Sequence, residues 1–162
     1  MSCRCGNSRK NDGKVCCHSN NTSQKKIIIK WKRLTVDGKT CERCSATEME
    51  IDKAFSALRD ALAHLGIEVL LEKETLTLEA FKQHPQSSNE ILIDDKPLES
   101  YIDAKVGHSK CCGVCSDEEC RTLETDAERY EIIPAEIIIR AVLLAAANKF
   151  DVDKHDCDCN LD

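Results

Sequence analysis

The sequence lacks several features that mark common functional classes. It has no apolar run long enough to span a bilayer, and its first residues, Met-Ser-Cys-Arg-Cys-Gly, contain no apolar core of a secretory leader. It has no basic excess either, since the formal net charge is -6 at pH 7, whereas nucleic-acid binding needs a concentrated basic face. We therefore expect a cytoplasmic protein that binds neither membranes nor nucleic acid, and we interpret the basic run from Lys25 to Arg33 as a solvated strand edge.

What the chain does have is an unusual number of thiols. Its 162 residues include 12 cysteines, although a chain of this length can bury a hydrophobic core without disulfides or metal. In a reducing cytoplasm, disulfides are mostly transient, catalytic or sensing. The cysteine count therefore indicates metal ligation or redox chemistry rather than a static disulfide framework.

The most informative pair is Cys41 and Cys44, which form a Cys-x-x-Cys between an apolar run and a long amphipathic segment. When the second cysteine enters a helix, both sulfurs face the same way near the helix N-terminus, where they can close a small disulfide ring or hold one soft ion. The helix dipole and the unpaired N–H groups stabilise a thiolate there, so we expect Cys41 to be the nucleophile and Cys44 the resolving thiol. A structural zinc half-site and an inert buried pair are the alternatives.

The distribution of apolar residues predicts one domain, residues 26–150, between two polar arms. Residues 1–25 are predicted to be disordered because they have almost no apolar residues, and residues 151–162 form an acidic tail. Both arms carry cysteines: Cys3, Cys5, Cys16, Cys17, Cys157 and Cys159. These thiols are either dispensable and exposed, or they collect a soft ion and pass it inward.

Within the domain, runs of β-branched residues predict strands and apolar residues at helical spacing predict helices. The expected strands cover residues 27–34, 67–72, 91–93 and 130–133. The first helix is expected to start at a capping box at Ser45 or Thr47, to include Leu65 on its apolar face, to carry His64 as a cap and to stop at Gly66. A short helix follows over residues 77–83, and a deeply packed helix runs over residues 134–149, while residues 98–104 fit a strand or a short helix. This order implies an α/β sandwich around a mixed sheet.

A second group of cysteines lies in one short stretch before the last expected strand: Cys111, Cys112, Cys115 and Cys120. Four sulfurs suffice for a tetrahedral thiolate site of the kind that zinc prefers, with His108 as a candidate extra ligand. A structural zinc knot or a disulfide formed during purification would explain the same residues. A further alternative is that Cys112 and Cys115 meet the Cys-x-x-Cys in space, which only the fold could bring about.

Five stretches carry a resemblance to a known family: Ile29-Lys30-Trp31-Lys32-Arg33-Leu34, Thr40-Cys41-Glu42-Arg43-Cys44, Ser88-Asn89-Glu90-Ile91, Cys120-Arg121 and Tyr130-Glu131-Ile132-Ile133-Pro134. Together with the element order, they resemble the thioredoxin-like fold over about residues 26–149. More closely, they are similar to a family of uncharacterised prokaryotic thioredoxin-like proteins, a domain of unknown function. The resemblance implies a thioredoxin-like mixed sheet flanked by helices, with a Cys-rich insertion before the last strand and helix.

Two departures from ordinary thioredoxins bear on function. No Trp directly precedes the Cys-x-x-Cys, because Trp31 lies well upstream in the first expected strand. The cis-proline that normally begins the third strand is replaced at the aligned position by Asn89 or Ser88, where we expect a trans peptide because a non-proline cis bond costs roughly 2.5 to 4 kcal/mol. The missing proline counts against a groove for a substrate peptide and leaves more space beside the sulfurs for a metal ion.

These observations predict a cytoplasmic thiol protein that binds soft metal or metalloid ions, with reduction or transfer of the ion left open. Mercury, arsenite, copper and zinc all remain candidates, and no organic cofactor is expected. The predicted ligands are six cysteines: Cys41, Cys44, Cys111, Cys112, Cys115 and Cys120. The alternatives are a thiol-disulfide oxidoreductase that uses Cys41 and Cys44 with a cellular thiol reductant, and a zinc-stabilised binding module without turnover.

Overall fold

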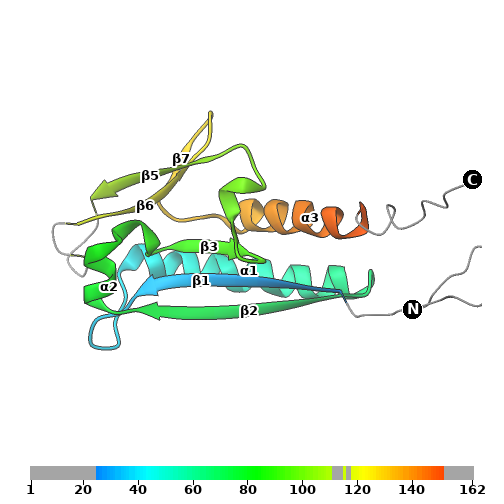
Figure 1. Ribbon diagram of the computed structural model, residues 1–162, viewed down its shortest axis with the longest axis horizontal. Coiled ribbons are helices and arrows are strands. Elements are labelled where there is room, and N and C mark those ends of the chain that lie inside the picture. Colours follow the sequence, from blue (N-terminus) through cyan, green and yellow to red (C-terminus); the bar gives the residue numbers. More distant parts are fainter. Residues whose placement is uncertain (1–24, 111–114, 116–117, 152–162) are drawn as a thin grey trace, which may run out of the picture.

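The computed structural model describes residues 25–110, 115 and 118–151. The predicted arm and tail therefore lie almost wholly outside the described residues, as do Cys111 and Cys112. The described part contains two β-sheets and two long helices (Figure 1). The predicted α/β class, with a mixed sheet and flanking helices, is confirmed.

The first sheet is mixed and has the strand order β2-β1-β3-β4. Its strands are β1 (Lys25–Leu34), β2 (Ile67–Leu76), β3 (Glu90–Ile93) and β4 (Lys96–Pro97). β1 is parallel to β2, with Lys25 opposite Ile67, and antiparallel to β3. In β1 the alternate side chains of Ile27, Ile29 and Trp31 are fully buried, as the two-residue period of a strand requires. The predicted strands over 27–34, 67–72 and 91–93 are thus confirmed, the second being longer than expected.

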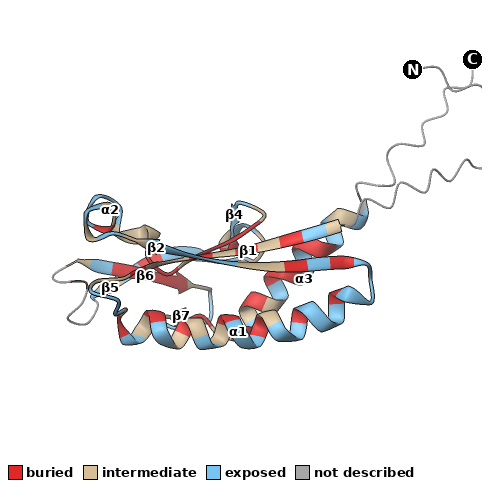
Figure 2. Ribbon diagram, turned by 90° about the horizontal axis from the view of Figure 1, so that it is seen from below, coloured by how far each residue is buried: buried red, intermediate tan, exposed pale blue. Residues whose placement is uncertain are grey.

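Two long helices, α1 (Glu42–Ala63) and α3 (Ala135–Asp151), pack on one face of this sheet. Figure 2 shows both helices on the same side of the strands. α1 buries one stripe of residues that recur every three or four positions, which places them on a single helical face: Ile51, Ala54, Leu58 and Leu62. These side chains and those of α3 complete the core over β1.

α1 begins earlier than the sequence predicts. Its N-cap is Cys41, so the capping boxes expected at Ser45 and Thr47 are wrong. Both residues lie inside the helix, and Thr47 Oγ1 instead accepts a hydrogen bond from the Ile133 backbone N–H at 3.4 Å. Capping rules favour Ser, Thr, Asn and Asp, so a cap made by a cysteine sulfur is not recognised from the sequence.

Two expectations about burial are also wrong. Leu65 lies beyond the end of α1 and is 57% exposed, although His64 is the C-cap and Gly66, with φ of 70°, ends the helical segment as predicted. α3 is not buried on most sides as expected, because Leu143 and Leu144 are 45% and 41% exposed. A helix that lies on a sheet buries one face, and these leucines lie on the other.

A second, antiparallel sheet follows with the order β5-β6-β7. Its strands are β5 (Lys105–Lys110), β6 (Glu119–Glu124) and β7 (Arg129–Tyr130). The sequence did not predict β5 and β6, since β6 buries polar side chains such as Arg121 and Thr122. The strand predicted over 130–133 is wrong beyond Tyr130, because the chain bends there to reach α3. In the sequence, the Cys-rich stretch follows β5, and its last cysteine, Cys120, belongs to β6.

The remaining elements are short: α2 (Leu78–Gln83), η1 (Pro85–Ser87) and η2 (Leu98–Ser100). α2 confirms the short predicted helix, which Thr77 caps and which ends before Pro85. The undecided stretch over 98–104 begins with a 3-10 helix and is not a strand. None of the helices in the described ranges has the length and apolar character needed to cross a membrane.

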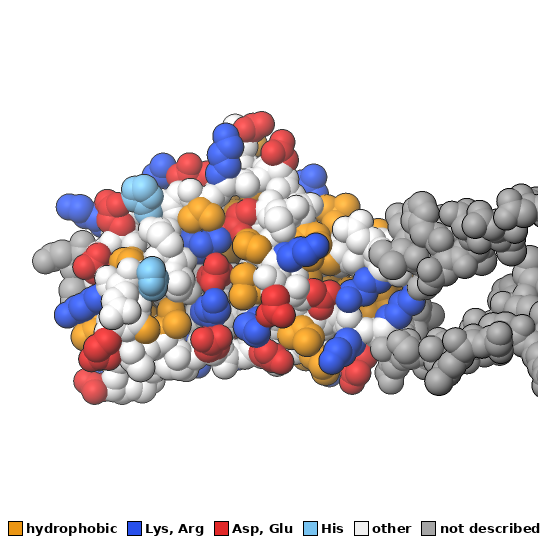
Figure 3. Space-filling model, in the orientation of Figure 1, with side chains coloured by type: hydrophobic (Ala, Val, Ile, Leu, Met, Phe, Trp, Pro, Cys, Tyr) orange, Lys and Arg blue, Asp and Glu red, His pale blue; other side chains and the backbone are white. Residues whose placement is uncertain are grey.

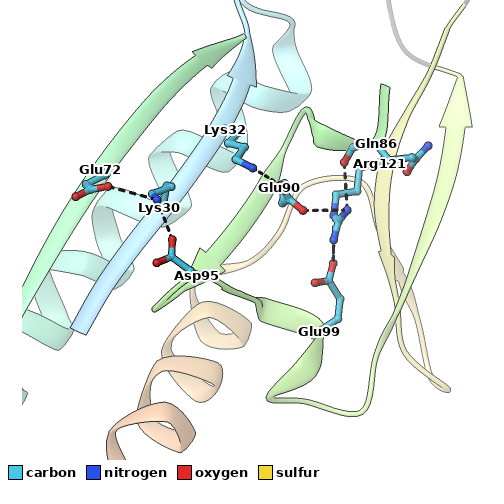
Figure 4. A network of polar contacts seen from close by, with 8 residues as sticks. All are labelled: Lys30, Lys32, Glu72, Gln86, Glu90, Asp95, Glu99 and Arg121. Atoms are coloured by element: carbon cyan, nitrogen blue, oxygen red, sulfur yellow. Dashed lines mark hydrogen bonds and ion pairs between the residues drawn. The ribbon is translucent and has the colours of Figure 1, made fainter. Parts of the chain in front are cut away.

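The basic residues of β1 form ion pairs with neighbouring elements. Lys30 Nζ lies 2.9 Å from Asp95 Oδ1, and Lys32 Nζ lies 2.9 Å from Glu90 Oε2 (Figure 4). Figure 3 shows Lys, Arg, Asp and Glu side chains interspersed over this face of the molecule. The interpretation of the basic run as a strand edge is wrong, because β1 is paired on both sides, with β2 and β3, and its lysines are balanced by these ion pairs.

The Cys-x-x-Cys and the two ends of the described chain lie at opposite ends of the molecule (Figure 1). Lys25 Nζ donates a hydrogen bond to the Lys149 carbonyl at 3.2 Å and lies 4.6 Å from the centre of the Phe150 ring. β1 has 10 residues and covers about 30 Å at roughly 3.3 Å per residue. Cys41 follows the far end of β1, so the start of β1 and the end of α3 lie away from it.

Candidate thiol site

Cys41 and Cys44 form the start of α1, immediately after the turn that follows β1. Cys41 has an extended backbone, with φ of -73° and ψ of 160°, and its Sγ accepts a hydrogen bond from the Cys44 backbone N–H at 3.4 Å. The side chains are thiols, and the two residues are only 3% and 2% exposed. The predicted position of the pair at a helix N-terminus is confirmed, and the structure adds that the pair is buried.

Two hydroxyl groups lie beside the Cys44 sulfur. Ser88 Oγ is 3.7 Å from Cys44 Sγ and also accepts a hydrogen bond from the Leu34 backbone N–H at 3.1 Å. Thr40 also faces Cys44, and its Oγ1 donates to the Leu34 carbonyl at 2.9 Å. The end of β1 therefore holds both hydroxyls next to the helix start.

The environment of Cys44 strongly favours its protonated form. The pKa of the Cys44 thiol is raised far above its ordinary value, first by its hydrogen bond to Cys41, then by burial and by the negative charge of an ionised Cys41. The Ser88 hydroxyl beside the sulfur acts in the opposite direction and lowers the pKa of Cys44. The surroundings of the pair therefore keep the proton on Cys44, while the nucleophile and resolving roles stay predictions.

The Ser88–Asn89 stretch is fixed against β1. Asn89 is buried and adopts a left-handed conformation with φ of 64°, which asparagine tolerates better than most residues. Its backbone N–H donates to the Lys32 carbonyl at 2.8 Å, and its Oδ1 accepts from Trp31 Nε1 at 3.2 Å. The peptide here is trans, as expected, because the described residues contain no cis bond.

Arg43, between the two cysteines, connects α1 to the second sheet. Its guanidinium donates to Ser109 Oγ at 2.9 Å and to the Lys110 carbonyl at 3.0 Å, and it lies 2.9 Å from Glu131 Oε2. Ser109 Oγ in turn donates to Glu131 Oε1 at 2.8 Å. The contacts bring the C-terminal end of β5, which leads into the Cys-rich stretch, next to the Cys-x-x-Cys.

Cys115 and Cys120 belong to the same buried core as the Cys-x-x-Cys. They are 1% and 2% exposed, and Cys120 lies opposite Ser109 in the β5–β6 pairing. Among residues 25–110, 115 and 118–151, no three Cys, His, Asp or Glu side chains form a group that could hold a metal ion. Cys111 and Cys112 lie outside these ranges, so the six-cysteine ligand set stays a prediction.

The histidines do not join the described thiols in such a group. His108 Nε2 lies 3.2 Å from Glu119 Oε2 across the β5–β6 pair, and its side chain is 62% exposed. His108 therefore forms an exposed cross-strand pair with Glu119. Its predicted role as an extra metal ligand gains no support from the described residues.

A polar network around Arg121, which the sequence does not predict, reaches Gln86 just before Ser88 in the chain (Figure 4). Arg121 in β6 is 6% exposed; it donates to Glu99 Oε1 from Nε at 3.1 Å and to the Gln86 carbonyl from Nη1 at 3.1 Å. Gln86 belongs to η1, which leads directly into Ser88. The pair Cys120-Arg121 carried part of the family resemblance, but no local pattern indicates that this arginine is buried.

Comparisons with known proteins place the chain in a family. The model of a domain of unknown function, DUF2703, matches residues 27–142. An uncharacterized protein of the archaeon Archaeoglobus fulgidus is 46% identical over 112 residues, which cover 69% of this chain and 82% of that protein. No solved structure gives a significant match. The chain belongs to the DUF2703 family.

Proposed function

We propose that this chain is a thiol protein that binds soft metal or metalloid ions through Cys41 and Cys44. The observation that carries the proposal is the presence of two buried sulfurs side by side at the N-terminus of a 22-residue helix. Thiolates favour thiophilic ions such as Cu(I) and Zn over hard cations. The helix N-terminus favours the negative charge that the bound sulfurs carry.

The arrangement of the first sheet supports a thioredoxin-like fold for this protein. The strand order is β2-β1-β3-β4, the first two strands in sequence are parallel, and the last two are antiparallel. Both long helices lie on one face, and the Cys-x-x-Cys joins β1 to α1. This is the arrangement that the sequence resemblance implies, with α2 reduced to 6 residues.

Ion binding would replace both thiol protons with sulfur–ion bonds. Cys41 loses its proton first, and its thiolate forms the first bond to the ion. The Cys44 S–H bond then breaks, its proton leaves to solvent, and the second sulfur binds. Because the pKa of Cys44 is raised, this proton is retained until the ion arrives. Binding therefore releases protons, as metal binding to thiols generally does.

The second cysteine group extends the proposal to further ligands. Cys115 and Cys120 share the core with the Cys-x-x-Cys, and Arg43 holds the end of β5 beside α1. We therefore keep Cys111, Cys112, Cys115 and Cys120 as additional ligands in the proposal, which would suit ions such as zinc that take four sulfurs. A zinc-stabilised module without turnover differs from the proposed ion-binding protein in one respect: removal of the metal would unfold it.

A thiol-disulfide oxidoreductase is the second candidate, favoured by the raised pKa of Cys44, the expected resolving thiol. The Cys41 thiolate would attack a substrate disulfide and form a mixed disulfide as the substrate S–S bond breaks. Cys44 would then lose its proton and attack Cys41, which transfers two electrons to the substrate and leaves a Cys41–Cys44 disulfide. A cellular thiol would reduce it again. The 3% exposure of Cys41 counts against this reaction, since a protein disulfide must reach the sulfur.

Anaerobic titration of the reduced protein with Cd²⁺ tests the proposal. We expect more than one equivalent to bind and the tightest site to disappear in Cys41→Ser/Cys44→Ser. The variant Cys115→Ser/Cys120→Ser tests the additional ligands and should lower the number of equivalents bound. Unchanged affinity in the Cys41→Ser/Cys44→Ser variant would refute the proposal, and turnover of a small disulfide by the wild type alone would favour the oxidoreductase.

A further inference from the structure

We propose that Ser88 is a positioning residue of the thiol site, whose hydroxyl donates a hydrogen bond to the Cys44 sulfur when that sulfur holds a soft ion. The inference rests on the proposed function, because it concerns the same pair of thiols. It assigns a separate donor to each sulfur. Cys41 Sγ accepts the Cys44 backbone N–H at 3.4 Å, and Cys44 Sγ has Ser88 Oγ at 3.7 Å.

The other hydrogen bond of Ser88 leaves its proton free to point to the sulfur. A serine hydroxyl has one proton to donate and two lone pairs that accept. Ser88 Oγ accepts the Leu34 backbone N–H at 3.1 Å, which uses a lone pair and leaves the proton available for the sulfur. Ser88 is 0% exposed, so bulk solvent does not compete for that proton.

Thr40 carries the second hydroxyl beside Cys44, but this hydroxyl donates its proton to another group. Its Oγ1 donates to the Leu34 carbonyl at 2.9 Å, and a hydroxyl has a single proton. Of these two hydroxyls, Ser88 is therefore the one that can donate to the Cys44 sulfur. Both depend on the same backbone unit, since Leu34 offers its N–H to Ser88 and its carbonyl to Thr40.

The chain around Ser88 is held in place before any ion binds. Next to it, the Asn89 backbone N–H donates to the Lys32 carbonyl at 2.8 Å, and Trp31 Nε1 donates to Asn89 Oδ1 at 3.2 Å. On its other side, Arg121 holds the Gln86 carbonyl at 3.1 Å. A donor fixed on both sides orients the sulfur without a further loss of side-chain freedom, as groups behind a metal ligand commonly do.

The consequence concerns a charged sulfur in a buried site. When the ion binds, the Cys44 S–H bond breaks, the proton leaves to solvent, and the sulfur keeps a partial negative charge. A hydrogen bond to an ionised acceptor is about twice as strong as one between neutral groups. Loss of a group that hydrogen-bonds to a metal-ligating side chain typically reduces metal affinity about 10- to 100-fold. We expect a reduction in this range for Ser88→Ala.

The test uses the reduced full-length protein, Cd²⁺ as the probe ion, and the ultraviolet sulfur-to-cadmium charge-transfer band. Subtraction of the Cys41→Ser/Cys44→Ser spectrum isolates the band of the pair. We expect Ser88→Ala to weaken this site about 10- to 100-fold and to shift its band to lower energy, because a sulfur that loses a hydrogen bond gives up charge more easily. Ser88→Thr, which keeps the hydroxyl, should restore the band energy, and Ser87→Ala is the matched control without effect.

The outcomes separate the two proposals. If the wild type shows no band beyond that of the double cysteine variant, both the proposed function and the role of Ser88 are contradicted. If the wild-type band is present but Ser88→Ala leaves its affinity and energy unchanged, the role of Ser88 alone is contradicted. Equal band shifts in Ser88→Ala and Ser88→Thr, with circular dichroism unchanged, would indicate packing rather than hydrogen bonding and would also overturn it.

Discussion

The Cys44 thiol carries a pH dependence that follows from its surroundings. Its hydrogen bond to Cys41, its burial and the charge of Cys41 all raise its pKa above the ordinary value of 9.0. Above about pH 9 the unfolded chain has lost this proton while the folded protein retains it. The folded state then binds more protons than the unfolded state, so stability falls as pH rises. The contribution of Cys44 is fully present below about pH 9 and is lost above it.

Urea unfolding of the reduced, metal-free protein at several pH values measures this effect. Between about pH 9 and about pH 10, the wild type should lose on the order of 1 kcal/mol more of its free energy of unfolding than Cys44→Ser does. The serine variant has no proton to lose in this range, so it controls for the other groups that titrate there. Identical pH profiles for the two proteins would show that Cys44 is not held neutral by the fold.

At the scale of elements, Arg43 joins α1 to β5 and to the segment before α3. Its side chain is 11% exposed, and it contacts Ser109, Lys110 and Glu131. Hydrogen bonds to charged groups contribute about 1.5–3 kcal/mol when well desolvated. This guanidinium therefore links the Cys-x-x-Cys to the second sheet, alongside the shared buried core.

Replacement of Arg43 by Ala should lower the free energy of unfolding by about 1–3 kcal/mol and increase hydrogen exchange in β5 and β6. The matched control is Arg59→Ala in the same helix, because Arg59 is 59% exposed and contacts only neighbours on its own helix among the described residues, with Asp60 Oδ1 at 3.3 Å and the Phe55 ring centre at 5.9 Å. An exposed pair of this kind contributes about 0–1 kcal/mol. Similar losses in the two variants, or exchange confined to α1, would argue against a link between α1 and the second sheet.

The buried arginine in β6 is a second connection between elements. Arg121→Ala should destabilise the protein by about 3–5 kcal/mol, because it leaves the Glu99 carboxylate buried without its partner. Arg129→Ala serves as control, since Arg129 is 57% exposed and pairs with Glu124 at 2.7 Å. Thermal and urea unfolding measure both. A double variant Arg121→Ala/Glu99→Ala that is no more stable than Arg121→Ala alone would contradict this explanation.

The elements that could be predicted are those with a clear local pattern. β1 and α1 follow from alternating and helical spacing of apolar residues, and the Cys-x-x-Cys spacing located the thiol pair at the helix start. β6 could not be predicted, because Arg121 is buried through partners in η1 and η2 that are distant in sequence. The contact between Ser88 and Cys44 joins residues 44 positions apart, so only the fold brings the hydroxyl to the sulfur.

For the molecule as a whole, the length of β1 separates the thiol pair from residues 25 and 151. These residues lie at the start of β1 and the end of α3, whereas the start of α1, which Cys41 caps, lies at the opposite end of the sheet (Figure 1). The separation is about 30 Å for a 10-residue strand.

The most direct test of the central claim is a crystal structure of the reduced protein loaded with Cd²⁺, with the ion located from its anomalous scattering. The account predicts an anomalous peak within bonding distance of both Cys41 Sγ and Cys44 Sγ, with Ser88 Oγ in hydrogen-bonding contact with the Cys44 sulfur. Cadmium bound only at other cysteines, with Cys41 and Cys44 remaining as thiols, would contradict the account.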